Sequence, residues 1–238
     1  MKIDDALSTI THFFNDIIGA IVPGLVLFAG LMLLHNGIAQ NAKIAALTSD
    51  TPSVLLVVVL SFAAGHGLLG IHSAIIEPAL KLLGWVKGDA VINKVEEARS
   101  FKLFKKLVDA KLQRPAALPN HEAETKWGFH DLRNVALSMS TEATSLGRRF
   151  MFIALLCNGM GTALILLAFD FLACSLWWRG ALLSYSTAPP YWLQFVGLIG
   201  LGLLCILRGD TFYRRAMSTP FSVATAELLM HEKADDAK

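Results

Sequence analysis

Charge is scarce in this chain, and long parts of it have none. Of the 238 residues, 17% are charged and 54% are hydrophobic, which is too apolar a composition for an ordinary soluble domain. Cysteine is also rare, and Cys157, Cys174 and Cys205 have no paired, metal-like spacing, so we interpret them as apolar packing residues. The GxSxG elbow, the phosphate-binding loop and the HExxH helix are all absent. We therefore expect no enzyme, no cofactor and no metal site.

Four long apolar stretches dominate what is present. They run from Phe14 to His35, Val54 to Leu80, Met151 to Trp178 and Tyr191 to Leu207. A helix needs about 20 apolar residues to cross a hydrocarbon core of about 30 Å, and backbone groups in lipid must be satisfied internally. The sequence therefore predicts an all-α, polytopic membrane protein with four transmembrane helices and a small helical cytoplasmic region.

Basic residues are concentrated in one connection. The connection from Asn36 to Ser53 holds only Lys43, and the connection between the third and fourth spans holds only Arg179. Residues 81–149, by contrast, hold Lys81, Lys87, Lys94, Arg99, Lys102, Lys105, Lys106, Lys111, Arg114, Lys126, Arg133, Arg148 and Arg149. By the positive-inside rule, we expect the basic segment and both termini to face the cytoplasm. An aromatic belt is expected on the other side, at Trp177, Trp178, Tyr185, Tyr191 and Trp192. Because Asp4 and Asp5 replace a basic n-region, we expect the first span to be retained.

The predicted organisation has four parts. Residues 1–80 form an N-terminal segment with the first two spans, 81–149 a cytoplasmic basic helical segment, 150–207 the last two spans, and 208–238 a cytoplasmic tail helix. In the basic segment, one apolar pattern recurs at Ile92, Val95, Ala98, Phe101, Phe104, Val108 and Leu112, and a second at Leu132, Val135, Met139, Ala143 and Leu146. The second pattern favours a helix that continues directly into the third span. Thr219 and Pro220 suit the cap and first turn of a tail helix that ends at Met230.

The basic helix has three interpretations. A solvated face beside anionic headgroups is the one we favour, because each juxtamembrane Lys or Arg gains about 1 kcal/mol there. Docking of a cytoplasmic protein is second. Nucleic-acid binding is not expected, because acidic residues interrupt the stripe and no recognised module is present. The residues assigned to headgroup or partner contact are Lys102, Lys105, Lys106, Arg148 and Arg149.

The second span carries the strongest polar pattern. His66, Gly70, Ser73 and Glu77 step by four, three and four residues, which places them on one face of a regular helix. Ionisable groups at membrane depth tend to face a bundle interior or a watery cavity, so this face is a candidate pore or proton-responsive lining. The alternative is that His66 and His72 bond to neighbouring helices while glycines permit close packing. For His72 we favour that alternative.

Polar and small residues in the other spans indicate packing or a kink. Pro23 and Gly24 are expected to kink or weaken the first span. Asn158 and Gly161 lie in a small polar patch suited to interhelical contacts, and Gly197 belongs to a set with Gly200 and Gly202. Asp170 lies toward the outer leaflet, where we expect it to pair with Arg179 or to meet water.

The stretch FFNDIIGAIVPGLVLFAGLMLL resembles the opening span of small bacterial four-span membrane proteins, some of them accessory or effector proteins of antiphage systems. The resemblance implies an oligomeric membrane effector or a membrane-anchored subunit. Two functions follow as hypotheses. One is a homo-oligomeric pore or membrane-perturbing effector. The other is a non-conducting anchor or sensor that recruits a cytoplasmic partner. The lipid bilayer and further copies of the chain are the expected partners.

Overall fold

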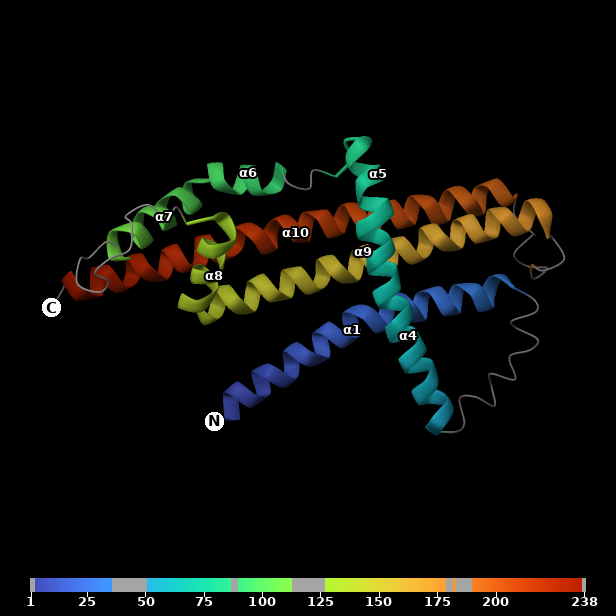
Figure 1. The fold of residues 1–238 in the computed structure, drawn as a ribbon, viewed down its shortest axis with the longest axis horizontal. Helices are drawn as coiled ribbons and strands as arrows, with labels where there is room; N and C mark the ends of the chain where they lie inside the picture. The colour runs from blue at the N-terminus through green and yellow to red at the C-terminus, as the bar shows by residue number, and fades with distance from the viewer. Residues whose placement is uncertain are drawn as a thin grey trace, which may run out of the picture. The chain divides into compact units, whose positions relative to one another are not determined.

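The computed structural model describes residues 3–35, 51–86, 90–112, 127–178, 182 and 190–236, and most of this part of the chain is helical (Figure 1). The helices are α1 Ile3–Leu34, α4 Thr51–Ile71, the π-helical turn η1 His72–Ile76, α5 Glu77–Leu82, α6 Ala90–Glu97, α7 Arg99–Leu112, α8 Phe129–Met139, α9 Thr141–Trp177 and α10 Tyr191–Asp236. The predicted all-α fold is confirmed. The loop predicted over Gln113–Glu124 lies outside the described residues.

Four helical segments are long and apolar enough to cross a membrane, as predicted. They are Ile17–Leu34, Val54–Leu82, Thr141–Trp177 and Tyr191–Met230. The protein is therefore a multi-pass membrane protein. Of the predicted aromatic belt, Tyr185 lies outside the described residues, and the other four side chains, Trp177, Trp178, Tyr191 and Trp192, are exposed.

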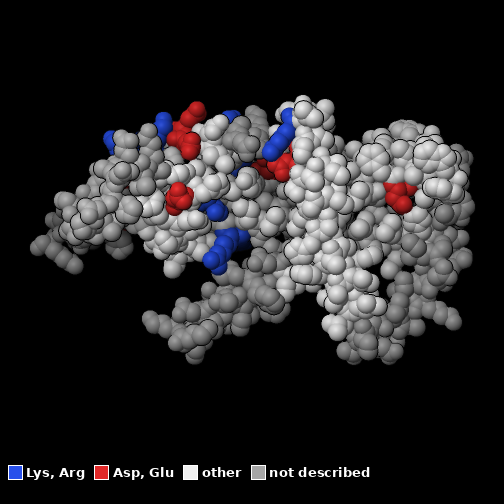
Figure 2. All heavy atoms as spheres, viewed as in Figure 1, with Lys and Arg blue, Asp and Glu red and all other residues white. Residues whose placement is uncertain are grey.

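The chain divides into two compact units, each formed by two separate parts of the sequence. Unit 1 comprises residues 1–86 and 152–210, and unit 2 comprises residues 87–151 and 211–238. Helices α9 and α10 each contribute residues to both units. The coloured Lys, Arg, Asp and Glu atoms in Figure 2 are sparse over α4, where most of the visible surface is white.

Glycine contacts determine how closely the helices of unit 1 approach. The Cα of Gly24 lies against the backbone of Ser61, and the Cα of Gly65 against the backbone of Ala20, so α1 and α4 touch at backbone distance. Helices α9 and α10 do the same, because a Cβ on Gly161 would lie 2.6 Å from the carbonyl oxygen of Gly202. Such small-residue contacts are typical of membrane helices, whose association depends on close van der Waals packing.

Unit 2 has a hydrophobic core of its own. Four phenylalanines meet in it, and the ring centroids of Phe101 and Phe221 are 4.9 Å apart while those of Phe104 and Phe221 are 5.6 Å apart. The buried members are Val91, Val95, Phe101, Phe104, Val108, Phe129, Leu132, Ala136, Met217, Phe221 and Ala224. The apolar periodicity of the basic segment therefore marks buried faces, although that segment forms two helices, α6 and α7, separated at Ala98.

Two predicted helix boundaries are wrong. The second apolar pattern does not continue unbroken into the third span, because Ser140 is extended between α8 and α9. The Ser140 hydroxyl accepts a bond from the Ala143 amide at 3.0 Å and donates to Glu227 Oε1 at 2.8 Å, so it caps α9 and ties it to α10. The separate tail helix is the second error, since α10 runs on to Asp236 with Pro220 inside it.

A side chain from another helix compensates for the proline. Pro220 has no amide hydrogen, so the carbonyl four residues earlier, at Ala216, loses its helical donor. Arg133 of α8 supplies a replacement, with Nη2 lying 3.4 Å from the Ala216 oxygen. Burial lowers the pKa of the Arg133 guanidinium, with partial opposition from Tyr213, but arginine stays protonated in proteins. Helix α10 therefore continues where its local sequence predicts an end.

Candidate functional site in the membrane unit

Most of the predicted polar face of the second span points away from the other described helices. His66, Gly70 and Ser73 are all exposed, and a Cβ on Gly67 or Gly70 would meet nothing within 4 Å. We call these four residues, His66, Gly67, Gly70 and Ser73, the α4 outer face. Its surroundings are apolar, with Leu56, Val59 and Ile75 exposed nearby on the same span.

His66 lies near the middle of the span Val54–Leu82. Its ring makes an edge contact with Phe62, at 4.5 Å between centroids, and it has no hydrogen bond within the described part of the chain. Ser73, by contrast, donates to the carbonyl of Gly70 at 3.0 Å, and Glu77 pairs with Lys81 at 3.0 Å. Of the titratable residues predicted on this face, His66 alone lacks a polar partner among the described residues.

The π turn η1 interrupts the regular face that the spacing predicts. The Glu77 amide bonds to the His72 carbonyl, five residues back, which inserts one extra residue into the turn. Residues after the turn are displaced by about 100° relative to a regular α-helix. Pro78 follows directly, and the wider turn gives its ring room beside the Ala74 carbonyl, with which it clashes in a regular helix. The i, i+3 and i+4 spacing from His66 therefore no longer predicts which face Glu77 lies on.

The opposite side of α4 is buried against other helices. His72 is buried, and its Nδ1 lies 3.3 Å from the Thr162 hydroxyl of α9. The Thr162 hydroxyl already donates its single proton to the Asn158 carbonyl at 2.8 Å. In the bond between His72 and Thr162, therefore, His72 Nδ1 is the donor and the hydroxyl oxygen is the acceptor. An interhelical hydrogen bond is the role we favoured for His72 from the sequence.

The residues predicted to pack between helices have different environments. Pro23 is buried, α1 stays continuous through it, and a Cβ on Gly159 would lie 2.6 Å from its Cγ. Asn158 lies against Gly209 of α10. A Cβ on Gly197 would meet nothing within 4 Å, so this glycine faces open space within the described part of the chain.

The basic residues assigned to headgroup or partner contact lie on the surface of unit 2. Lys102, Lys106, Arg148 and Arg149 are exposed, and Lys105 is half-buried. These side chains are available to a headgroup or to a protein.

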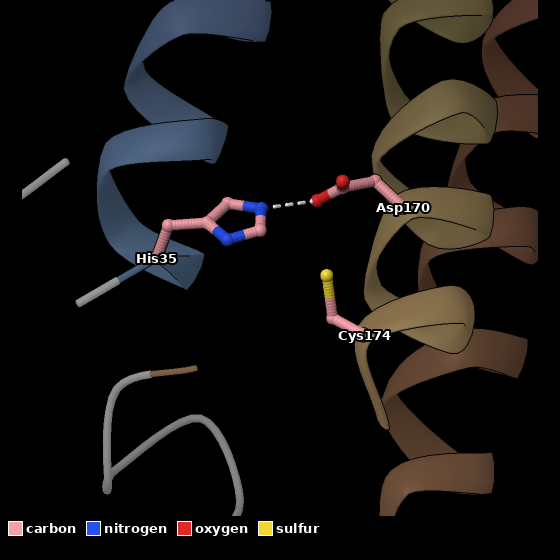
Figure 3. A group of neighbouring side chains, drawn as sticks. All are labelled: His35, Asp170 and Cys174. Atoms are coloured by element: carbon pink, nitrogen blue, oxygen red, sulfur yellow. Dashed lines mark hydrogen bonds and ion pairs between the residues drawn. The ribbon is translucent and has the colours of Figure 1, made fainter. Parts of the chain in front are cut away.

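Unit 1 contains a second polar cluster, which the sequence analysis did not predict. His35, Asp170 and Cys174 each offer one ligand atom, and these atoms all lie within 4.8 Å of one another (Figure 3). His35 Nε2 is 2.6 Å from Asp170 Oδ2. The expected partner of Asp170, Arg179, lies outside the described residues, and the partner found is His35. The spacing of Asp170 and Cys174 was the available signal, because residues four apart share a helix face.

No family model, no curated protein and no solved structure matches this chain. The α4 outer face and the His35–Asp170–Cys174 cluster are therefore the two features on which a functional proposal rests.

Proposed function

We propose that the protein is a homo-oligomeric effector of the bacterial inner membrane that perturbs membrane permeability, with the α4 outer face lining a polar path between copies. Both termini and unit 2 then lie in the cytoplasm, where unit 2 receives the activating signal. Antiphage defence is the biological setting that the resemblance of the first span implies.

His66 is the observation that carries this proposal. An imidazole near the middle of a span, exposed and without a hydrogen-bond partner in the described protomer, is unfavourable against hydrocarbon. Residues of this kind normally face other helices or water. A second copy of the chain, or water held between copies, gives the imidazole the partner that its own protomer lacks.

The glycines beside His66 support contact between copies. Gly67 and Gly70 have open space where a Cβ would project, so another helix can approach at backbone distance. Ser73 is already bonded to its own helix and adds no unsatisfied donor to such an interface.

Ion flux through liposomes tests the proposal. Wild-type protein is expected to conduct, and His66→Leu to change the flux at least about tenfold, equivalent to about 1.4 kcal/mol, with little loss of folded protein. Val54→Leu, an exposed apolar position on the same helix but about 120° around it from His66, is the matched control and should conduct like the wild type. Native mass measurement in nanodiscs should show oligomers. Full flux from His66→Leu, or monomers only, would overturn the proposal.

A non-conducting anchor is the second candidate, and the core of unit 2 favours it. Helices α6, α7 and α8 pack with parts of α9 and α10 into a module with four central phenylalanines, and exposed lysines give that module a basic surface. Such a module can hold a soluble partner at the membrane. Wild-type liposomes that leak no faster than protein-free liposomes would favour this function.

A further inference from the structure

We propose that His35, Asp170 and Cys174 form a binding site for a thiophilic divalent transition metal ion of the zinc class. One imidazole nitrogen, one carboxylate oxygen and one sulfur lie within 4.8 Å of one another. The site shares no residue with the α4 outer face, so the metal-binding proposal does not depend on the proposed function.

Secondary structure on both sides holds the three side chains in place. Asp170 and Cys174 lie one turn apart on α9, and both point toward the end of α1 (Figure 3). His35 directly follows α1. Its amide bonds to the Leu31 carbonyl at 2.9 Å, and its backbone pairs with Leu182. The three ligands are thus presented by backbone that is itself hydrogen-bonded, which limits the reorganisation needed for binding.

The environment combines a buried thiol with an accessible carboxylate. Cys174 is 7% exposed and packs with Phe171 and Leu182. The side chains of His35 and Asp170 are 14% and 34% exposed. An ion can therefore enter beside Asp170, and a water molecule can complete its coordination there, while the sulfur is shielded by apolar residues.

The donor set selects the class of ion. Thiolate and imidazole ligands suit zinc and similar transition metals, whereas magnesium and calcium prefer oxygen alone. Zinc binds nitrogen and oxygen at about 2.0–2.2 Å and sulfur at about 2.3 Å in a tetrahedron, so ligand atoms lie about 3.3–3.8 Å apart. The His35–Asp170 pair, now 2.6 Å apart, must therefore open slightly, and the sulfur already lies within 4.8 Å of both atoms. Binding releases the thiol proton of Cys174 to water.

Metal titration of the purified full-length protein tests the site. We expect one Zn²⁺ per chain, and Co²⁺ in its place to give a sulfur-to-cobalt charge-transfer band. Cys174→Ser should abolish the band and weaken Zn²⁺ binding by more than about 100-fold, because even loss of an outer-shell partner costs about 10–100-fold. Asp170→Asn, which preserves shape and still accepts a bond from His35, should weaken binding while the protein stays folded.

The other two cysteines provide the controls. Cys157→Ser/Cys205→Ser leaves Cys174 as the one remaining cysteine, and this double variant should retain both the band and the stoichiometry. It tests the assignment of the sulfur even if Cys174→Ser fails to fold. No Zn²⁺ binding by the wild type, or a band that is lost in the double variant, would overturn the site and leave His35–Asp170 as a simple ion pair.

Discussion

The Cα of Gly65 in α4 lies directly against the carbonyl oxygen of Ala20 in α1, leaving no room for a side chain at position 65. Two residues further along, Gly67 faces open space. The same residue type thus has opposite roles at neighbouring positions of one helix, which gives a direct test of the α1–α4 packing.

Gly65→Ala is expected to destabilise the packing of α1 against α4, whereas Gly67→Ala should leave that packing within one chain unchanged. The new methyl at position 65 overlaps backbone, which no rotamer change relieves, at a cost of about 1–3 kcal/mol. At position 67 alanine gains up to about 1 kcal/mol of helix propensity. Thermal unfolding of the purified variants in one detergent measures both. Equal melting temperatures would contradict the close α1–α4 approach.

The Arg133–Ala216 bond should matter only while Pro220 is present. Arg133→Met keeps the aliphatic stem but leaves the Ala216 carbonyl without its donor, at a cost of about 1–3 kcal/mol. In a Pro220→Ala background, the residue 220 amide bonds that carbonyl, and the same change should cost much less. Hydrogen exchange of peptides covering 211–224 measures the local stability of all four proteins in this cycle. Strictly additive effects would show that Arg133 does not compensate for the proline.

Reporter fusions test the orientation that the basic loop predicts. Fusions at Lys87 and the C-terminus should report cytoplasm, and those at Ala45 and Pro189 the opposite side, because basic flanks are retained inside. An outside signal at Lys87 would reverse the assigned topology.

Periodicity in the sequence predicted most of the fold, because burial in lipid and in a helical core follows from composition and spacing. The four spans and the buried phenylalanines Phe101 and Phe104 were predictable in this way. Pro220 was not, because its effect on α10 is decided by Arg133, which comes from another helix. The extended Ser140 likewise depends on a contact with Glu227 of another helix, whereas the π turn has a local signal in Pro78.

One candidate site could be predicted from the sequence, whereas the other depends on tertiary packing. His66 is recognisable because a histidine inside an apolar run is rare, and its exposure required only the correct face of α4. The His35–Asp170–Cys174 cluster combines residues 135 positions apart, and only the packing of α1 against α9 brings them together. Two of its three residues, Asp170 and Cys174, nevertheless have a four-residue spacing that is visible in the sequence.

The arginine that completes α10 has a consequence for synthesis of the chain. Arg133 lies 83 residues before Ala216. The ribosome therefore adds this donor well before it adds Pro220, which leaves the Ala216 carbonyl without a backbone donor. A nascent α10 that has not yet met α8 has a free carbonyl at Ala216 and a weak point at Pro220. The last helix therefore becomes continuous only when the earlier part of unit 2 is in place, which makes the completion of α10 a late step in the biogenesis of the protein.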